Sequence, residues 1–326
     1  MQSHDAFSEG APMLYGVIDI GSNTIRLTVY EVDERNRTFS AFFKLKTMAG
    51  LVSYIDKKTS LMSKEGIERL IEVCEEYLAC AAHFKDLDGP YAFATAGVRN
   101  AKNADAVIKR VEKACGMRID LISGREEAEL GYVGAMCQSS LTTGVQIDVG
   151  GGSVEVSTFR DGRIVQATSV PQGSLSLFGS YVHNLLPTPA ESDRIREAIR
   201  SRIRDVKDFR GFSCATASAV GGSARAARRL RNAWYPDRKD APEVTREEIA
   251  LVLDRASYDP YAATRDILRV VPERAHTCIP GLLVIETVMD EFGASTLEIS
   301  DFGVREGYLL TRVFDLPKDA RPFARP

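Results

Sequence analysis

Two short apolar segments of this chain each carry an aspartate near their end and run directly into a glycine-containing turn. The first segment spans residues 13–20 and is followed by a turn at 21–24 and an alternating segment at 25–32. The second spans residues 144–149 and is followed by a turn at 150–153 and a segment at 154–159. Each unit predicts a β-hairpin, because period-two or continuous apolar runs on both sides of a tight turn are typical of paired strands. Their recurrence indicates two related halves.

Between and after these hairpins, strand patterns alternate with helix patterns, which predicts layered α/β domains. In residues 63–83 the apolar positions recur with the spacing of an amphipathic helix. The further predicted strands are 38–47, 91–95, 118–122, 164–169 and 296–300. The further predicted helices are 104–115, 125–137, 191–209, 223–230, 246–257, 262–270, 282–292 and one beginning near 304.

A length of 326 residues is typical of two domains. We place them at residues 13–132 and 133–302, with a last helix at about 303–315 that packs back on the first domain. Residues 1–12 and 316–326 are expected to be disordered tails. The first dozen residues lack the features of a signal peptide, and we expect a cytoplasmic protein that does not interact with a membrane.

The first turn has the chemistry of an anion site at the end of a strand. A glycine permits close backbone approach to a ligand, turn amides can form an anion-binding nest, and an arginine can bind phosphate through two hydrogen bonds. The candidate phosphate-binding residues are Gly21, Ser22, Asn23, Thr24 and Arg26, and Asp19 supplies a carboxylate. An ordinary hairpin with a polar turn is the alternative interpretation.

The second turn contains three consecutive glycines, which is more than a hairpin needs and indicates a backbone wrapped around a phosphate. Its candidate phosphate-binding residues are Gly150, Gly151, Gly152 and Ser153. Asp148 and Glu155 flank it and are hard oxygen ligands suited to Mg²⁺. A third motif, Gly221, Gly222 and Ser223, begins a helix and predicts another anion site.

The composition argues against several other classes of protein. A net charge of −3 disfavours a nucleic-acid-binding domain. The six cysteines show no Cys-x-x-Cys spacing and the four histidines form no ligand pattern, so disulfide frameworks and zinc sites are disfavoured.

In this order the motifs DIGSNTIRL, ATAGVRNAKN, ISGREEAELGY, IDVGGGSVEV, VGGSARAA and GVREGYLL resemble the exopolyphosphatase and guanosine pentaphosphate phosphatase family, over about residues 14–312. The resemblance implies the actin-like ATPase superfold shared with sugar kinases and Hsp70, in which two ribonuclease H-like domains enclose a cleft. It implies hydrolysis of the terminal phosphoanhydride of inorganic polyphosphate, in a short two-domain form suited to short chains. The alternative is the 5′-phosphohydrolysis of guanosine pentaphosphate.

The resemblance also assigns roles to residues. Glu127 matches the general base of the family, although Ser123 followed by Glu126 also reads as a helix-capping box. Arg99 matches an arginine-bearing segment that contacts phosphate. The implied cofactor is Mg²⁺ or Mn²⁺, with K⁺ as a further cation, held by Asp19, Asp148 and Glu155. The implied partners are polyphosphate or a phosphorylated guanine nucleotide, and a second copy of the chain in a homodimer.

Two groups of arginines lie in the second half of the chain. We interpret Arg194, Arg196, Arg200, Arg202 and Arg204 as a solvated helix face, and Arg225, Arg228, Arg229 and Arg231 as candidate contacts to polyphosphate. Two further functions stay open at this stage, an ATP-dependent kinase of the same superfold and a regulator that binds an alarmone without catalysis.

Overall fold

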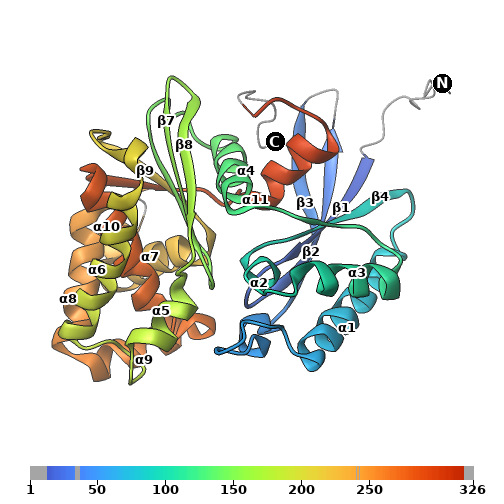
Figure 1. Cartoon of the computed structure of the whole chain (residues 1–326). Coiled ribbons are helices and arrows are strands. Elements are labelled where there is room, and N and C mark those ends of the chain that lie inside the picture. Colours follow the sequence, from blue (N-terminus) through green and yellow to red (C-terminus); the bar gives the residue numbers. More distant parts are fainter. Residues whose placement is uncertain (1–12, 34–36, 240, 242, 319–326) are drawn as a thin grey trace.

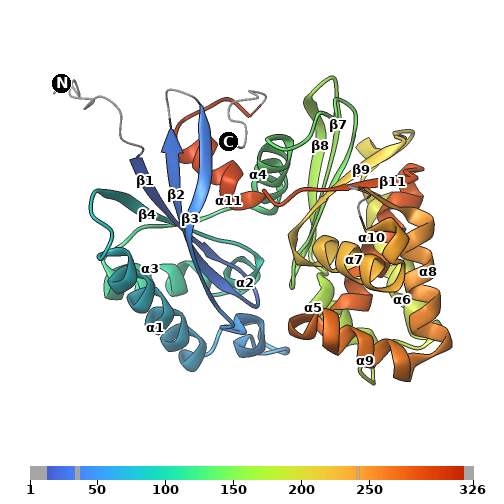
Figure 2. The same cartoon turned by 180° about the vertical axis from the view of Figure 1, so that it is seen from behind.

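The computed structural model describes residues 13–33, 37–239, 241 and 243–318, and it contains two mixed β-sheets with helices around them (Figures 1 and 2). The predicted tail at 1–12 and residues 319–326 of the predicted tail at 316–326 lie outside the described residues. The first sheet has the strand order β3-β2-β1-β4-β5. Its strands are β1 (Met13–Ile20), β2 (Ile25–Asp33), β3 (Thr38–Thr47), β4 (Leu87–Ala94) and β5 (Ile119–Leu121).

The second sheet repeats the hairpin of the first one, as the sequence predicted. Its strand order is β10-β11-β9-β6-β7-β8, with β6 parallel to β9 and antiparallel to β7. Its strands are β6 (Gly144–Val149), β7 (Val154–Arg160), β8 (Arg163–Val170), β9 (Thr216–Val220), β10 (Val244–Thr245) and β11 (Thr296–Ile299). In both hairpins the strand before the turn also pairs in parallel with a strand from later in the chain, β4 or β9.

The helices divide between the two sheets. In Figure 1, α1, α2 and α3 lie beside the first sheet, α5 to α10 lie on the side of the second sheet, and α4 and α11 run between the sheets. The bounds are α1 (Lys64–Ala81), α2 (Ala96–Arg99), α3 (Ala104–Cys115), α4 (Gly124–Met136), α5 (Ser174–Tyr181), α6 (Pro189–Asp205), α7 (Gly221–Trp234), α8 (Arg246–Tyr258), α9 (Pro260–Val270), α10 (Cys278–Phe292) and α11 (Val304–Tyr308). The described part of the chain has no helix of the length and apolarity that a bilayer span requires.

A third apolar cluster joins the halves, beside one core under each sheet. It contains aromatic residues from both sheets and from α11, with Tyr132 and Phe159 at a ring-centroid distance of 5.0 Å and Phe93 and Tyr308 at 4.7 Å. Burial of such rings, at about 25 cal/mol per Å² of apolar surface, resists separation of the halves.

Helix α11 lies against strands of the first sheet although it follows the second in sequence. The Tyr30 hydroxyl donates to Glu306 Oε1 at 2.5 Å, and the Tyr308 hydroxyl donates to Asp120 Oδ2 at 2.6 Å. The boundary that we placed between residues 132 and 133 falls inside the continuous helix α4, which packs on the second sheet and on α11.

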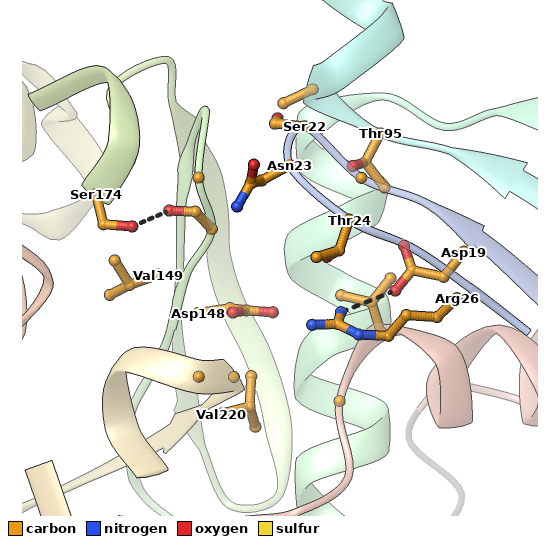
Figure 3. Close-up of a pocket in the computed structure, with 18 of the residues that line it drawn as sticks. Asp19, Ser22, Asn23, Thr24, Arg26, Thr95, Asp148, Val149, Ser174 and Val220 are labelled. Atoms are coloured by element: carbon orange, nitrogen blue, oxygen red, sulfur yellow. Dashed lines mark hydrogen bonds and ion pairs between the residues drawn. The ribbon is translucent and has the colours of Figure 1, made fainter. Parts of the chain in front are cut away.

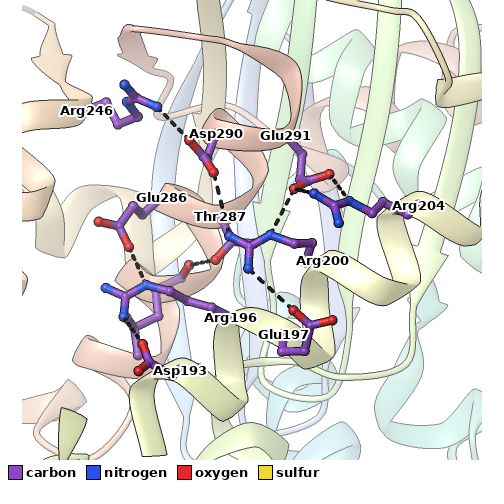
Figure 4. Close-up of polar contacts among 11 residues, drawn as sticks. Asp193, Arg196, Glu197, Arg200, Arg204, Arg246, Glu286, Thr287, Asp290 and Glu291 are labelled. Atoms are coloured by element: carbon purple, nitrogen blue, oxygen red, sulfur yellow. Dashed lines mark hydrogen bonds and ion pairs between the residues drawn. The ribbon is translucent and has the colours of Figure 1, made fainter. Parts of the chain in front are cut away.

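Arg196 and Arg200 of α6 are half-buried and ion-paired with α10, which corrects the interpretation of a solvated face for these two of the five arginines, whereas Arg204 pairs with α10 but stays exposed. Arg196 Nε lies 2.9 Å from Glu286, Arg200 Nε lies 3.0 Å from Glu291, and Arg204 Nε lies 2.8 Å from Glu291 (Figure 4). The two helices bring opposite charges together along their contact, so these ion pairs link α6 to α10.

Two local predictions were wrong. Helix α5 was missed, because its sequence SLSLFGSY contains a glycine and lacks a polar face of helical period. The helix predicted at 191–209 ends at Asp205, and a separate 3-10 turn follows at Lys207–Phe209.

The crossing of α4 and α11 depends on glycine at position 134. A Cβ there would overlap the carbonyl oxygen of Gly303. We expect Gly134→Ala to lower the free energy of unfolding by ~1–3 kcal/mol, because the backbone must move apart to admit the methyl group. Gly179→Ala in α5 is the control, since no atom lies within 4 Å of its added Cβ and alanine favours the helix. Chemical denaturation of both variants measures the difference, and equal stabilities would contradict this account.

Candidate active site

The two glycine turns lie against each other between the sheets. Each is closed by a backbone hydrogen bond, Gly21 N to Thr24 O at 3.1 Å and Gly150 N to Ser153 O at 3.0 Å. A Cβ on Gly152 would lie 2.5 Å from the Ser22 hydroxyl oxygen. The second turn therefore touches the first one, and a side chain at 152 would require the Ser22 hydroxyl to move.

A third glycine turn approaches the same point from the end of β9. Gly221 has a φ of 85°, a conformation that favours glycine. A Cβ there would lie 2.7 Å from Asp148 Oδ1, and a Cβ on Gly222 would occupy the space of the Arg274 guanidinium. Glycine at 221 and 222 therefore leaves space for two charged side chains, those of Asp148 and Arg274, at the start of α7.

These turns line one pocket between the halves, shown in Figure 3. In that view Ser22, Asn23, Thr24 and Asp19 lie on one side, and Asp148 and Ser174 lie on the other. The predicted site residues that line the pocket are Asp19, Gly21, Ser22, Asn23, Thr24, Arg26, Glu127, Asp148, Gly150, Gly151, Ser153, Gly221 and Gly222. Four predicted site residues are not among the lining residues, namely Arg99, Gly152, Glu155 and Ser223.

Those four residues have other surroundings. Gly152 contacts Ser22, as described above. Ser223 is fully buried beside Gly281, and its hydroxyl has no hydrogen-bond partner in the described part of the chain. Glu155 is fully buried on β7 and accepts a hydrogen bond from the Ser169 hydroxyl at 2.7 Å. Arg99 donates to Glu127, which the sequence did not predict.

Glu127 lies in the first turn of α4 with only 7 % of its surface exposed. Its Oε2 accepts a hydrogen bond of 2.6 Å from Arg99 Nη1. Burial raises the pKa of Glu127 to about 7, although Arg99 opposes this shift. Glu126 makes the predicted capping box with Ser123 instead, so the two neighbouring glutamates are divided between a structural role and the pocket.

Asp148 faces the first half of the chain from β6. Its pKa is raised to about 6, chiefly by burial and in part by nearby Asp19, against the opposing effect of Arg225. Asp19 lies 3.5 Å from Arg26 Nη1 and 3.7 Å from Arg305 Nε. The pocket wall thus carries acidic groups as well as cations, and its lining carboxyl groups are those of Asp19, Glu127, Asp148, Glu273, Asp301 and Glu306.

Two of these carboxylates, Asp19 on β1 and Asp148 on β6, are candidate ligands for a divalent cation. Within the described ranges, no three His, Cys, Asp or Glu side chains gather closely enough to hold a metal ion. Mg²⁺ commonly takes one or two carboxylates and completes its shell with water and substrate phosphate. Asp19 and Asp148 suit that arrangement, whereas Glu155 is engaged by Ser169 outside the pocket lining.

Both halves of the chain contribute cationic side chains to the wall of the pocket. The lining cations are Arg26, Lys46, Arg225, Arg274 and Arg305. The side chains of Lys46, Arg225 and Arg274 have no hydrogen-bond or ion-pair partner among the residues that the structure describes. Burial lowers the pKa of each of these three groups, and neighbouring arginines lower it further. Such crowding favours an anion bound between them.

Sequence reasoning missed Lys46, Arg274 and Arg305. Arg305 lies within the quoted motif GVREGYLL, which could have drawn attention to it, but no local pattern distinguishes Lys46 or Arg274. Of the second arginine group only Arg225 lines the pocket.

The other three arginines of that group have protein partners, which corrects the interpretation as a contact to polyphosphate for the fully buried Arg231, while it stays a prediction for Arg228 and Arg229. Arg228 Nη2 lies 3.8 Å from Asp301 Oδ1, and Arg229 Nη1 lies 3.0 Å from Glu273 Oε1. Arg231 is fully buried, with Nη1 3.3 Å from Glu248 Oε2.

Comparisons with known proteins agree with the resemblance. A family model described as the Ppx/GppA phosphatase family matches residues 28–315. The chain is 26 % identical over 313 residues to a protein named exopolyphosphatase 1 from Mycobacterium leprae, covering 92 % of this chain and 90 % of the relative.

Solved structures extend the similarity to the fold. The Ppx/GppA family member of Aquifex aeolicus superposes with a TM-score of 0.76 at 25 % identity, over 93 % of this chain and 98 % of that one. An exopolyphosphatase from Cytophaga hutchinsonii superposes with a TM-score of 0.80 at 18 % identity, over 94 % of this chain and 100 % of that one. The predicted fold class is therefore confirmed.

The cationic walls lead to a binding prediction that does not depend on catalysis. We expect pyrophosphate to raise the melting temperature, because an anion bound to the native state stabilises it by mass action. Arg225→Gln should weaken pyrophosphate binding about tenfold, since a hydrogen bond to a charged group contributes ~1.5–3 kcal/mol. Arg265→Gln is the charge-matched control on α9, outside the pocket lining. Thermal shift titrations compare the three proteins, and equal affinities would contradict the assignment.

Proposed function

The chain belongs to the Ppx/GppA phosphatase family, and from this premise we propose that it is an exopolyphosphatase that releases orthophosphate from the end of inorganic polyphosphate. The observation that carries the proposal is the set of three cations without a described partner, Lys46, Arg225 and Arg274, on the two walls of the pocket. A phosphate chain presents an anionic group at every unit, so it can engage all three at once.

The character of the pocket wall favours an inorganic chain over guanosine pentaphosphate. No aromatic side chain is among the lining residues of the described pocket. Proteins commonly hold a base by stacking it on an aromatic ring or an arginine plane. Here the arginines of the wall repel one another, and a phosphate bound between them would relieve this repulsion.

The turns would hold the terminal phosphoryl group from two sides. Turns 21–24 and 150–153 line the pocket from its two sides, so their hydroxyls and the amides that do not close the turns would be donors to a bound phosphoryl group, and fixed donors stabilise negative charge without rearranging during the reaction. A family of this kind uses a divalent cation, and Mg²⁺ held by Asp19 and Asp148 would neutralise charge on the phosphoryl oxygens.

Glu127 would then orient the attacking water and accept its proton. Its Oε1 has no hydrogen-bond partner within the described residues, while Oε2 is held by Arg99. A buried carboxylate with a raised pKa is a stronger base than an exposed one. A kinase of the same superfold must instead position the hydroxyl of an acceptor, so a carboxylate poised for water supports the hydrolase.

Turnover of the purified protein on two substrates tests the proposal. We expect phosphate release from polyphosphate with a higher kcat/KM than from guanosine pentaphosphate. Glu127→Gln should lower kcat on polyphosphate by about 10²–10⁴, because general-base catalysis is lost. Glu126→Gln is the matched control and should stay within about threefold of the wild type, since glutamine can still accept the capping hydrogen bond.

The other outcomes distinguish the rival functions. Faster turnover of guanosine pentaphosphate would identify the chain as a nucleotide phosphohydrolase. Nucleotide binding without any phosphate release would favour a regulator, and ATP turnover that needs a small acceptor would favour a kinase.

The pH dependence follows from the raised pKa of Glu127. The base must be deprotonated to accept a proton, and its pKa of about 7 places this change near neutrality. We therefore expect kcat/KM to fall about tenfold per pH unit below pH 7 and to level off above it. The Glu127→Gln variant should lack this acidic limb in its residual activity. A limb that persists unchanged in the variant would assign the titration to another group.

A further inference from the structure

Arg99 sits at the end of α2 with its guanidinium turned toward protein groups. Its Nη1 donates to the carbonyl oxygen of Ile122 at 3.2 Å and to Glu127 Oε2 at 2.6 Å. Its Nη2 lies 4.0 Å from Glu155 Oε1. Its side chain is 18 % exposed. The guanidinium therefore lies mostly buried between two carboxylates, those of Glu127 and Glu155, beside the pocket.

This position does not match a direct phosphate contact. Arg99 is absent from the residues that line the pocket, whereas five other cations line it. The guanidinium also lies over the start of α4, where a Cβ on Gly124 would come within 3.6 Å of Nη2. Reaching a phosphate would require Arg99 to leave two buried carboxylates with less compensation.

We propose that Arg99 is a positioning residue for the reaction, holding Glu127 Oε2 so that Oε1 alone is presented to the attacking water. This inference rests on the proposed function, because Arg99 would act only through Glu127, the base of the proposed reaction. The ion pair fixes the rotation of the carboxylate, and it joins α2 beside the first sheet to α4 on the second.

The other charged groups around Glu127 have different roles. Glu155 on β7 is the second carboxylate at Arg99, and the Ser169 hydroxyl donates to it. Asp148 on β6 and Asp19 on β1 act on Glu127 from across the pocket by repulsion. Arg99 is the cation that both opposes these charges and touches the base, so its removal leaves Glu127 misoriented.

A double-mutant cycle with steady-state kinetics on polyphosphate tests the role. We expect Arg99→Ala to lower kcat about 100-fold while KM changes less than about threefold, because a misplaced base slows chemistry without weakening substrate binding. In the Glu127→Gln background, Arg99→Ala should cost no further rate beyond about threefold, since residues that act as a unit are not additive. Added guanidinium at low concentration should restore part of the activity of Arg99→Ala only where Glu127 is present.

A conservative variant covers the case in which Arg99→Ala does not fold, because that change leaves buried carboxylates unpaired. Arg99→Lys keeps the charge without the planar geometry, and we expect about a tenfold loss of kcat that again disappears in the Glu127→Gln background.

Two kinetic results would overturn the inference. One is an equal loss of kcat on removing Arg99 with and without Glu127, and the other is a rise in KM above tenfold at unchanged kcat, as for a substrate contact. Absence of phosphate release by the wild type would instead overturn the proposed function itself, so the two failures are distinguishable.

Discussion

The contact between the two glycine turns determines how the site is built. The Gly152 backbone lies so close to Ser22 that a side chain at 152 would meet the serine hydroxyl at 2.5 Å. Each turn caps the strand that precedes it, and those strands belong to different sheets. The contact between the turns thus joins the two sheets at one edge of the pocket, in addition to the apolar cluster that packs α4 and α11 between them. The polar groups of both turns converge only because no side chain separates them.

The charges of the pocket follow from the same closeness. Acidic groups on β1, β6 and α4 are drawn into one buried volume, and burial raises the pKa of Asp148 to about 6 and that of Glu127 to about 7. The pKa values of Lys46, Arg225 and Arg274 are lowered by burial and by repulsion from neighbouring arginines. Neither set is fully compensated by the described protein groups, so a divalent cation and a polyanion are complementary ligands for the same space.

The sequence predicted the parts of the site that are local and missed those that depend on tertiary approach. Both hairpins were predicted because a buried strand, a glycine turn and a second strand are contiguous in the chain. Lys46 lies on an exposed strand position that no pattern separates from other surface lysines, and it becomes part of the pocket only because β3 ends beside the cleft. Glu155 was grouped with Asp148 because both flank the glycine turn, and in the structure the two do pair across the hairpin. Adjacent strands lie about 4.8 Å apart, so Glu155 is displaced from the pocket toward Ser169 on β8.

Glu126 and Glu127 are neighbouring residues of the same type, but Glu126 caps helix α4 and Glu127 lines the pocket. Successive residues in a helix point about 100° apart, so a helix that caps itself with Glu126 must direct Glu127 elsewhere, here into the pocket. Because α4 packs on the second sheet while Arg99 comes from α2 beside the first, the carboxylate of Glu127 is held by both halves of the molecule. In the proposed reaction, the ion pair that orients Glu127 and the contact between the two turns would both depend on how the two halves of the chain are held together.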